Sequence, residues 1–122
     1  MKDNSDNDID IATFVKMIFS AYETKNREQA ENLLTNDFTF TSPLDDHINR
    51  KTYFDKCWTF SNENPKYKFE KIFVKDNEVF VLYECETKSH KKFRNTEFFK
   101  FEGSKIKAVE VYFGDTLEEM SK

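Results

Sequence analysis

Glycine and proline are scarce in this sequence, with two of each among 122 residues. This scarcity excludes collagen-like repeats, flexible glycine-serine linkers and proline-rich segments. It also leaves no room for the glycine-rich loops that bind phosphate groups or dinucleotides. The longest apolar run, residues 79–83, is far shorter than the roughly 20 residues that a membrane-spanning helix needs. The sequence therefore predicts neither a nucleotide-dependent enzyme nor a membrane protein.

Histidine, cysteine and surplus positive charge are also in short supply. His47 and His90 are too few for a histidine-rich metal site, and we expect neither a metal nor another cofactor. The net charge of −4 argues against a nucleic-acid partner, because proteins that bind duplexes need a strongly basic surface. Cys57 and Cys85 fall in apolar helix and strand patterns, and no N-terminal segment has the pattern of a secretion signal. We therefore expect reduced cysteines in a cytoplasmic protein.

Aromatic residues are abundant, with 14 Phe, 5 Tyr and 1 Trp, and they mark most of the expected elements. We expect residues 1–7, which are polar, to be frayed or disordered, and residues 8–122 to form a single domain. Asn26, with Gln29 three residues later, is typical of the N-cap of a second helix. A first helix is predicted from apolar side chains at helical spacing, namely Ile11, Phe14, Val15, Ile18, Phe19 and Tyr22.

A short strand and a third helix are expected next. The strand covers residues 38–41, where apolar and polar side chains alternate, and it ends at Pro43. A polar loop that contains His47 leads to Asn49, a candidate N-cap. The inner face of the helix that follows would carry Tyr53, Phe54, Cys57 and Trp58.

After Pro65 the apolar pattern changes from helical spacing to alternation. Four strands joined by short hairpins are expected at residues 67–74, 79–87, 92–101 and 105–113. The order of these elements predicts an α+β fold. Three N-terminal helices would pack on one face of a curved antiparallel sheet, built from one short strand and a four-strand meander.

Three stretches of the chain carry a family resemblance: residues 21–27 (AYETKNR), 33–43 (LLTNDFTFTSP) and 97–106 (EFFKFEGSKI). With the order of elements, they resemble the nuclear transport factor 2-like superfamily, in particular its SnoaL-like and ketosteroid-isomerase-like branch. The resemblance covers nearly the whole chain. It implies a cone-shaped, strongly curved sheet whose interior often holds an apolar small molecule. It also implies dimers that pair through the outer face of the sheet.

The resemblance indicates which positions carry catalysis in ketosteroid isomerases. The base of those enzymes, an Asp just before the proline, corresponds to Ser42 here. Their tyrosine donor on the first helix corresponds to Phe19, with Tyr22 about one turn away, and their second acidic residue corresponds to Glu97. Because only the last position keeps its chemistry, we do not expect steroid isomerisation by that route.

The third long strand places an acidic residue among aromatic ones. Alternation puts Phe93, Asn95, Glu97, Phe99 and Phe101 on one face, which we expect to point inward because it carries no positive charge. Burial of a carboxyl group there should raise its pKa. We hypothesise that Glu97 transfers or holds a proton while Asn95 orients a ligand oxygen. Alternatively, Glu97 lies at the rim, solvated or paired with a lysine.

Other candidate site residues surround this pair. His47 could transfer a proton at neutral pH, although a solvated loop histidine is the alternative. Glu84 and Glu86 should face outward unless a β-bulge reverses them. We expect the ligand-binding wall to consist of Phe19, Tyr22, Phe40, Ser42, Tyr53, Phe54, Trp58, Phe99 and Phe113.

The opposite face of the strands is expected to be a protein interface. Alternation gathers Phe80, Leu82, Phe98 and Tyr112 on it, and an exposed apolar patch of this kind usually marks an interaction surface. We therefore expect a two-fold homodimer through this outer face.

Two functions fit the sequence. In the first, the cone binds a small apolar or carbonyl-bearing molecule and supports acid–base chemistry of the isomerase, cyclase or hydratase type. In the second, the protein is a non-catalytic dimerisation or ligand-sensing module. Its cone would then be filled by Phe38, Phe40, Phe99 and Phe113. The volume of the cavity distinguishes the two.

Overall fold

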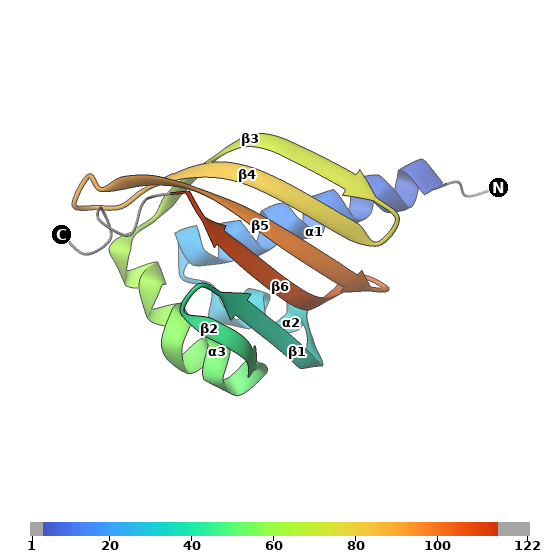
Figure 1. Ribbon diagram of the computed structural model, residues 1–122, viewed down its shortest axis with the longest axis horizontal. Coiled ribbons are helices and arrows are strands. Elements are labelled where there is room, and N and C mark those ends of the chain that lie inside the picture. Colours follow the sequence, from blue (N-terminus) through green and yellow to red (C-terminus); the bar gives the residue numbers. More distant parts are fainter. Residues whose placement is uncertain (1–3, 115–122) are drawn as a thin grey trace.

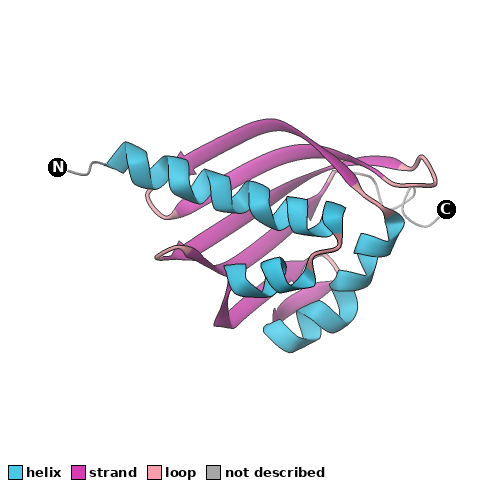
Figure 2. Cartoon of the chain, turned by 180° about the vertical axis from the view of Figure 1, so that it is seen from behind, coloured by secondary structure: helices cyan, strands magenta, loops and turns pink. Residues whose placement is uncertain are grey.

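Three α-helices form one layer of the molecule. The computed structural model describes residues 4–114, with side chains from Ile11 onward. The helices are α1 (Asn4–Thr24), α2 (Arg27–Leu33) and α3 (Arg50–Cys57), and a 3₁₀ helix, η1 (Trp58–Glu63), follows α3. Figure 2 shows all of them on one side of the sheet.

The other layer is a six-stranded sheet with the strand order β2-β1-β6-β5-β4-β3. Its strands are β1 (Leu34–Ser42), β2 (Asp45–Asn49), β3 (Lys66–Lys75), β4 (Glu78–Glu86), β5 (Lys92–Glu102) and β6 (Lys105–Phe113). The meander from β3 to β6 is antiparallel, and Figure 1 shows how strongly it curves around α1. The predicted α+β architecture, with helices on one face of a curved sheet, is confirmed.

The sheet differs from the prediction in two respects. It is mixed rather than antiparallel, because β1 runs parallel to β6. It also has an additional strand, β2, where a polar loop was expected. Strand β2 pairs with β1 through the Phe40–Ile48 register, and its sequence gave no alternation signal because Ile48 is its only large apolar residue. Pairing with β1, rather than local propensity, makes this segment a strand.

Curvature of the sheet has an identifiable cause in two bulges. The β3–β4 register shifts between Phe69 and Lys71, and the β5–β6 register shifts between Lys100 and Phe101. A bulge bends its strand and increases the local twist. The β4–β5 ladder is regular, so Tyr83 points inward and Glu84 outward, as simple alternation predicted.

Both predicted N-caps are present. Asn26 Oδ1 accepts a hydrogen bond from Gln29 N at 3.1 Å, and Asn49 Oδ1 accepts one from Thr52 N at 2.9 Å. Each satisfies a backbone donor that the first helical turn leaves free. The caps fix the residues at which α2 and α3 begin.

The apolar core lies between α1 and the concave face of the sheet. The predicted stripe of α1 is buried there, with Val15 fully inaccessible and Phe19 5% exposed. From the sheet, Val79, Val81 and Phe99 complete this layer. None of the helices among residues 4–114 is long and apolar enough to cross a bilayer.

The ends of the chain are described only in part. Helix α1 begins at Asn4, within the segment expected to be frayed. Residues 1–3 and 115–122 lie outside the described residues.

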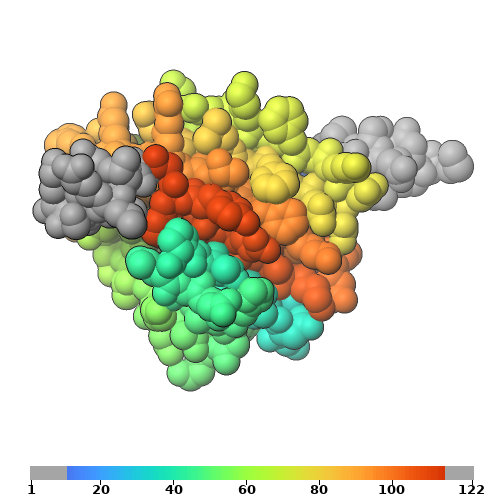
Figure 3. Space-filling model, viewed as in Figure 1, coloured from blue at the N-terminus to red at the C-terminus, as the bar shows by residue number. Residues whose placement is uncertain are grey.

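The outer face of the sheet carries the expected apolar surface. Phe80 is 45% and Tyr112 54% exposed, and the rings of Phe80 and Phe98 lie 4.9 Å apart. Phe73 on the adjacent strand is also exposed and stands opposite Phe80. Figure 3 shows this face, on which β4, β5 and β6 lie side by side. We call Phe73, Phe80, Leu82, Phe98 and Tyr112 the outer patch; it remains a predicted homodimer interface.

The dimer is tested by placing a charge at the centre of the outer patch. Phe80→Glu should halve the molecular mass measured by light scattering at micromolar concentration, because two copies would bring like charges into a buried surface. Leu44→Glu, which alters another exposed apolar side chain in the β1–β2 turn, should leave the mass unchanged. A wild-type protein of monomeric mass would contradict the prediction.

Candidate active site

A cavity of about 360 Å³ lies between the helices and the concave face of the sheet. The sequence-predicted residues that line it are Phe19, Tyr22, Phe40, Ser42, Tyr53, Asn95, Glu97, Phe99 and Phe113. They come from α1, β1, α3, β5 and β6. The cavity therefore brings together segments that are distant in the sequence around one apolar space.

Three predicted site residues do not line this cavity, and their placement corrects the sequence analysis. The His47 side chain is 68% exposed, because its left-handed backbone (φ 51°) and the bond from its N–H to Thr41 Oγ1 turn the ring toward solvent. Phe54 is buried, but it lies beneath the guanidinium group of Arg27, 4.9 Å from the ring centroid. Trp58 directly follows α3 and keeps its helical spacing from Phe54, but its ring packs against the rings of Tyr22 (4.7 Å) and Phe54 (6.3 Å) rather than on the cavity wall.

Phenylalanine side chains form the wall of the cavity rather than a plug. Phe38, Phe40, Phe99 and Phe113 all line the open space. Phe19 helps to hold the wall apart because it packs edge-on against several rings at once. Its centroid lies 4.8 Å from Tyr67, 4.9 Å from Tyr83 and 5.9 Å from Phe99. Edge-to-face contacts of this kind fix ring orientation, so the interior is preformed and open.

Glu97 lies in the middle of β5 and points into the cavity. Its strand neighbours are Val81 and Val111, which are 0% and 7% exposed. The accessible surface that Glu97 keeps faces the cavity. Burial in this apolar setting raises its pKa from 4.5 to about 7, although a hydrogen bond from Tyr83 partly opposes the rise. No cation pairs with Glu97 among the described residues, so a rim position beside a lysine is not what the structure shows.

A chain of hydrogen bonds holds the Glu97 carboxyl in place. Tyr83 donates its hydroxyl proton to Glu97 Oε2. Asn95 Nδ2 donates to the Tyr83 oxygen at 3.3 Å, and Asn95 Oδ1 accepts from Gly114 N at 3.2 Å. A Cβ atom at position 114 would lie 2.0 Å from a backbone oxygen, so only glycine allows this approach. Asn95 is therefore a positioning residue that acts through Tyr83.

Two tyrosines provide a second polar group in the cavity. The hydroxyl oxygens of Tyr22 and Tyr53 lie 2.6 Å apart. Burial raises the pKa of each, and the nearby Glu97 charge contributes to both shifts. Both hydroxyls are therefore protonated at neutral pH. Because the bond between them uses one hydrogen, the other remains available to donate to a ligand.

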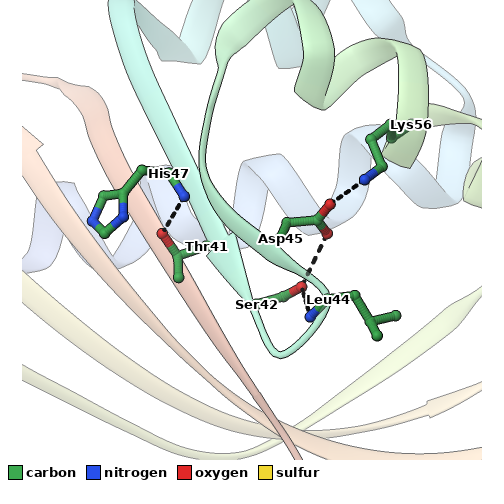
Figure 4. A network of polar contacts seen from close by, with 6 residues as sticks. All are labelled: Thr41, Ser42, Leu44, Asp45, His47 and Lys56. Atoms are coloured by element: carbon green, nitrogen blue, oxygen red, sulfur yellow. Dashed lines mark hydrogen bonds and ion pairs between the residues drawn. The ribbon is translucent and has the colours of Figure 1, made fainter.

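An ion pair lies at the mouth of the cavity. Asp45, in β2, contacts Lys56 of α3 and accepts a hydrogen bond from Ser42 Oγ at 3.0 Å. Lys56 and Ser42 hold the pKa of Asp45 below its usual value, mainly through the contact with Lys56. Figure 4 shows this network on one side of the β1–β2 hairpin, with His47 pointing away on the other. Ser42 thus stabilises the mouth and is not itself an acid or base.

Sequence reasoning missed several of these lining residues. Alternation placed Tyr83 inward, but nothing in the sequence pointed to its bond with Glu97. Asp45 and Lys56 could not be paired without knowledge of β2, which brings them together. Among residues 11–114, whose side chains the structure describes, no group of three or more His, Cys, Asp or Glu side chains is arranged to hold a metal ion.

A known domain family matches most of the chain. The profile of the SnoaL-like domain matches residues 15–109. The chain belongs to the SnoaL-like domain family, within the nuclear transport factor 2-like superfamily. The predicted family is thereby confirmed. No curated protein sequence matches the chain significantly.

Solved structures share this SnoaL-like fold along nearly their whole length. An NTF2-like protein of unknown function from Cytophaga hutchinsonii is 21% identical, with a TM-score of 0.76 over 92% of this chain and 95% of its own. An NTF2-like protein from Anabaena variabilis is also 21% identical, with a TM-score of 0.76 over 95% of this chain and 96% of its own. An LEH-like epoxide hydrolase from M. tuberculosis is 14% identical, with a TM-score of 0.74 over 94% of this chain and 89% of its own. At these identities, the likeness shows the fold alone.

Burial of Glu97 in this SnoaL-like protein predicts a pH-dependent effect of Glu97→Gln on stability. The pKa of Glu97 is about 7 when folded and near its ordinary 4.5 when unfolded, so the wild type loses stability as pH rises between these values. Glutamine carries no charge and avoids this loss. Relative to the wild type, the variant should gain up to about 3 kcal/mol in the free energy of unfolding between pH 4 and pH 8.

Urea unfolding of both proteins at the two pH values measures this gain. Glu84→Gln, which removes a carboxylate from the outer face of β4, provides the matched reference. A stability difference between Glu97→Gln and wild type that stays constant with pH would contradict the burial of the charge.

Proposed function

We propose that this SnoaL-like protein binds a small, largely apolar, carbonyl-bearing molecule in its cavity and carries out acid–base chemistry on it with Glu97. Reactions of the isomerase, cyclase or hydratase type require a group that transfers a proton to or from the substrate. The observation that carries the proposal is the carboxyl group of Glu97, which has a pKa of about 7 on the wall of an apolar cavity.

The apolar part of the ligand is inferred from the cavity wall. Aromatic and aliphatic side chains make up most of the lining, including Phe38, Phe99 and Val109. The volume of about 360 Å³ falls in the lower part of the range of small-molecule sites, which is about 300–1,000 Å³. A molecule of this kind would displace water from the wall and gain the hydrophobic term on binding.

The role of Glu97 follows from its pKa. A general base or acid works best when its pKa is close to the pH at which it operates. With a pKa of about 7, Glu97 has comparable amounts of both forms at neutral pH, so it can accept a proton in one step and return it in the next. Tyr83 holds one carboxylate oxygen, which leaves the other free for proton transfer.

The carbonyl group is inferred from the Tyr22–Tyr53 pair. One hydroxyl hydrogen of this pair is free to donate to a ligand oxygen. Removal of a proton next to a carbonyl places negative charge on its oxygen, and a preorganised donor stabilises that charge. Glu97 would take the proton while the tyrosine pair holds the oxygen.

Two further observations support the proposal indirectly. One of the similar solved structures is named an epoxide hydrolase, so a fold like this one has been assigned a hydrolytic reaction. The cavity is open rather than filled by its Phe side chains, which favours ligand binding over the alternative of a purely structural module.

A cytoplasmic location is part of the same proposal. Cys57 and Cys85 are both free thiols, and burial raises their pKa to about 11 and about 12. Reduced cysteines of this kind are typical of proteins in reducing compartments.

Hydrogen–deuterium exchange next to a carbonyl tests the acid–base step. With 2-tetralone in D₂O, followed by proton NMR, the protein should accelerate loss of the signal from the hydrogens beside the carbonyl. The rate should increase with pH through about 7, because the deprotonated form of Glu97 is the base. Glu97→Gln should lower the catalysed rate about 100-fold or more.

Glu84→Gln serves as the control for this experiment and should exchange at the wild-type rate. Exchange that is no faster than in buffer, or equally fast with Glu97→Gln, would contradict the proposed chemistry. Binding of 2-tetralone without exchange would support a ligand-binding role alone.

A further inference from the structure

The charged side chains of the cavity are unevenly paired. Those that line it are Asp45, Lys56, Lys91 and Glu97. Asp45 and Lys56 neutralise each other, and Glu97 accepts a hydrogen bond from Tyr83. The ammonium group of Lys91 makes no hydrogen bond or ion pair with any other residue of the described part of the chain. Within the described part of the chain, the mouth therefore carries one positive charge that has no partner.

Hydrogen bonds and a ring contact hold the β4–β5 hairpin, which carries Lys91, beside the mouth of the cavity. Within the hairpin, Thr87 N donates to Lys91 O at 2.9 Å, and at its base Lys88 N donates to Glu63 O of η1 at 2.8 Å. Phe93, the first inward-facing residue of β5, packs against Phe60 of η1 with centroids 6.2 Å apart. Both aromatic residues line the cavity, so these contacts hold Lys91 at its edge.

The two ends of the cavity favour different ligand groups. Lys91 is exposed, whereas Glu97 lies six residues farther along the chain, at most about 20 Å away in an extended strand. An anionic group beside Glu97 would be buried next to another carboxyl group without a cation, which is strongly unfavourable. The same group beside Lys91 would meet a positive charge and remain in contact with water.

We propose that the cavity takes an elongated apolar molecule that carries a carboxylate at one end. Lys91 binds the carboxylate at the mouth, and the neutral, oxygen-bearing end lies beside Glu97 and the Tyr22–Tyr53 pair. Lys91 thereby determines specificity, because it selects the anionic ligand and sets the direction in which it enters. This inference rests on the proposed function and narrows its ligand class.

The test compares an acid with its own ester. The probes are 10-hydroxydecanoic acid, which has a carboxylate and a neutral polar end, and methyl 10-hydroxydecanoate, which lacks the charge. Calorimetry at low salt should show that the wild type binds the acid about fivefold more tightly, a value typical of a partly exposed ion pair. The preference should decrease as salt is added.

The variants are Lys91→Gln and, as the matched control in the same hairpin, Lys88→Gln, whose side chain does not line the cavity. Lys91→Gln should lose the preference for the acid and bind the ester as the wild type does, which also shows that the cavity is intact. Lys88→Gln should keep the preference.

The outcomes separate this inference from the function on which it rests. Equal binding of acid and ester by the wild type would overturn the inference and leave apolar ligand binding in place. If Lys91→Gln and Lys88→Gln lost the preference for the acid equally, the inference would also be overturned, since the hairpin would then act through its overall charge. If neither probe bound, the proposed ligand-binding function would be contradicted as well.

Discussion

The site depends on one unfavourable interaction, the burial of the Glu97 carboxyl group without a cation. The free energy of this burial is what raises its pKa to about 7. A hydrogen bond from Tyr83 reduces the cost but does not remove it, and Asn95 and Gly114 keep Tyr83 in position. Gly114, just past the end of β6, thus helps to orient the Glu97 carboxyl group in the middle of β5 through Asn95 and Tyr83.

The fold maintains this situation by keeping the interior both apolar and open. Bulges in β3 and β6 curve the sheet around α1, and α3 closes the far side through Tyr53, whose hydroxyl meets that of Tyr22. Edge-on contacts of Phe19 lock the aromatic wall, which keeps it from collapsing onto Glu97. Apart from Glu97, the charged side chains of the lining lie at the mouth, where the nearly buried Asp45 pairs with the half-exposed Lys56. The two ends of the cavity therefore differ chemically: Glu97, with a pKa of about 7, lies inside, and the other charged side chains lie at the mouth.

Much of this arrangement could be predicted from the sequence where the signal is local. The helical stripe of α1 and the alternation along β5, which turned Glu97 inward, need no knowledge of distant residues. Features that depend on pairing across the chain could not be predicted. Strand β2 has almost no apolar pattern, so its pairing with β1 and the Asp45–Lys56 contact escaped the sequence analysis, and the choice between a catalytic and a solvated His47 could not be made. The bonds of Asn95 to Tyr83 and Gly114 escaped for the same reason, because Gly114 lies beyond the end of another strand.

The most direct test of the central claim is the pKa of Glu97 itself. Carbon-13 NMR of protein labelled at glutamate carboxyl groups follows each titration, and comparison with Glu97→Gln identifies the signal. The structure predicts a midpoint at about pH 7. A midpoint near 4.5, the ordinary value for this group, would show that the carboxyl is solvated and would contradict the account of the site.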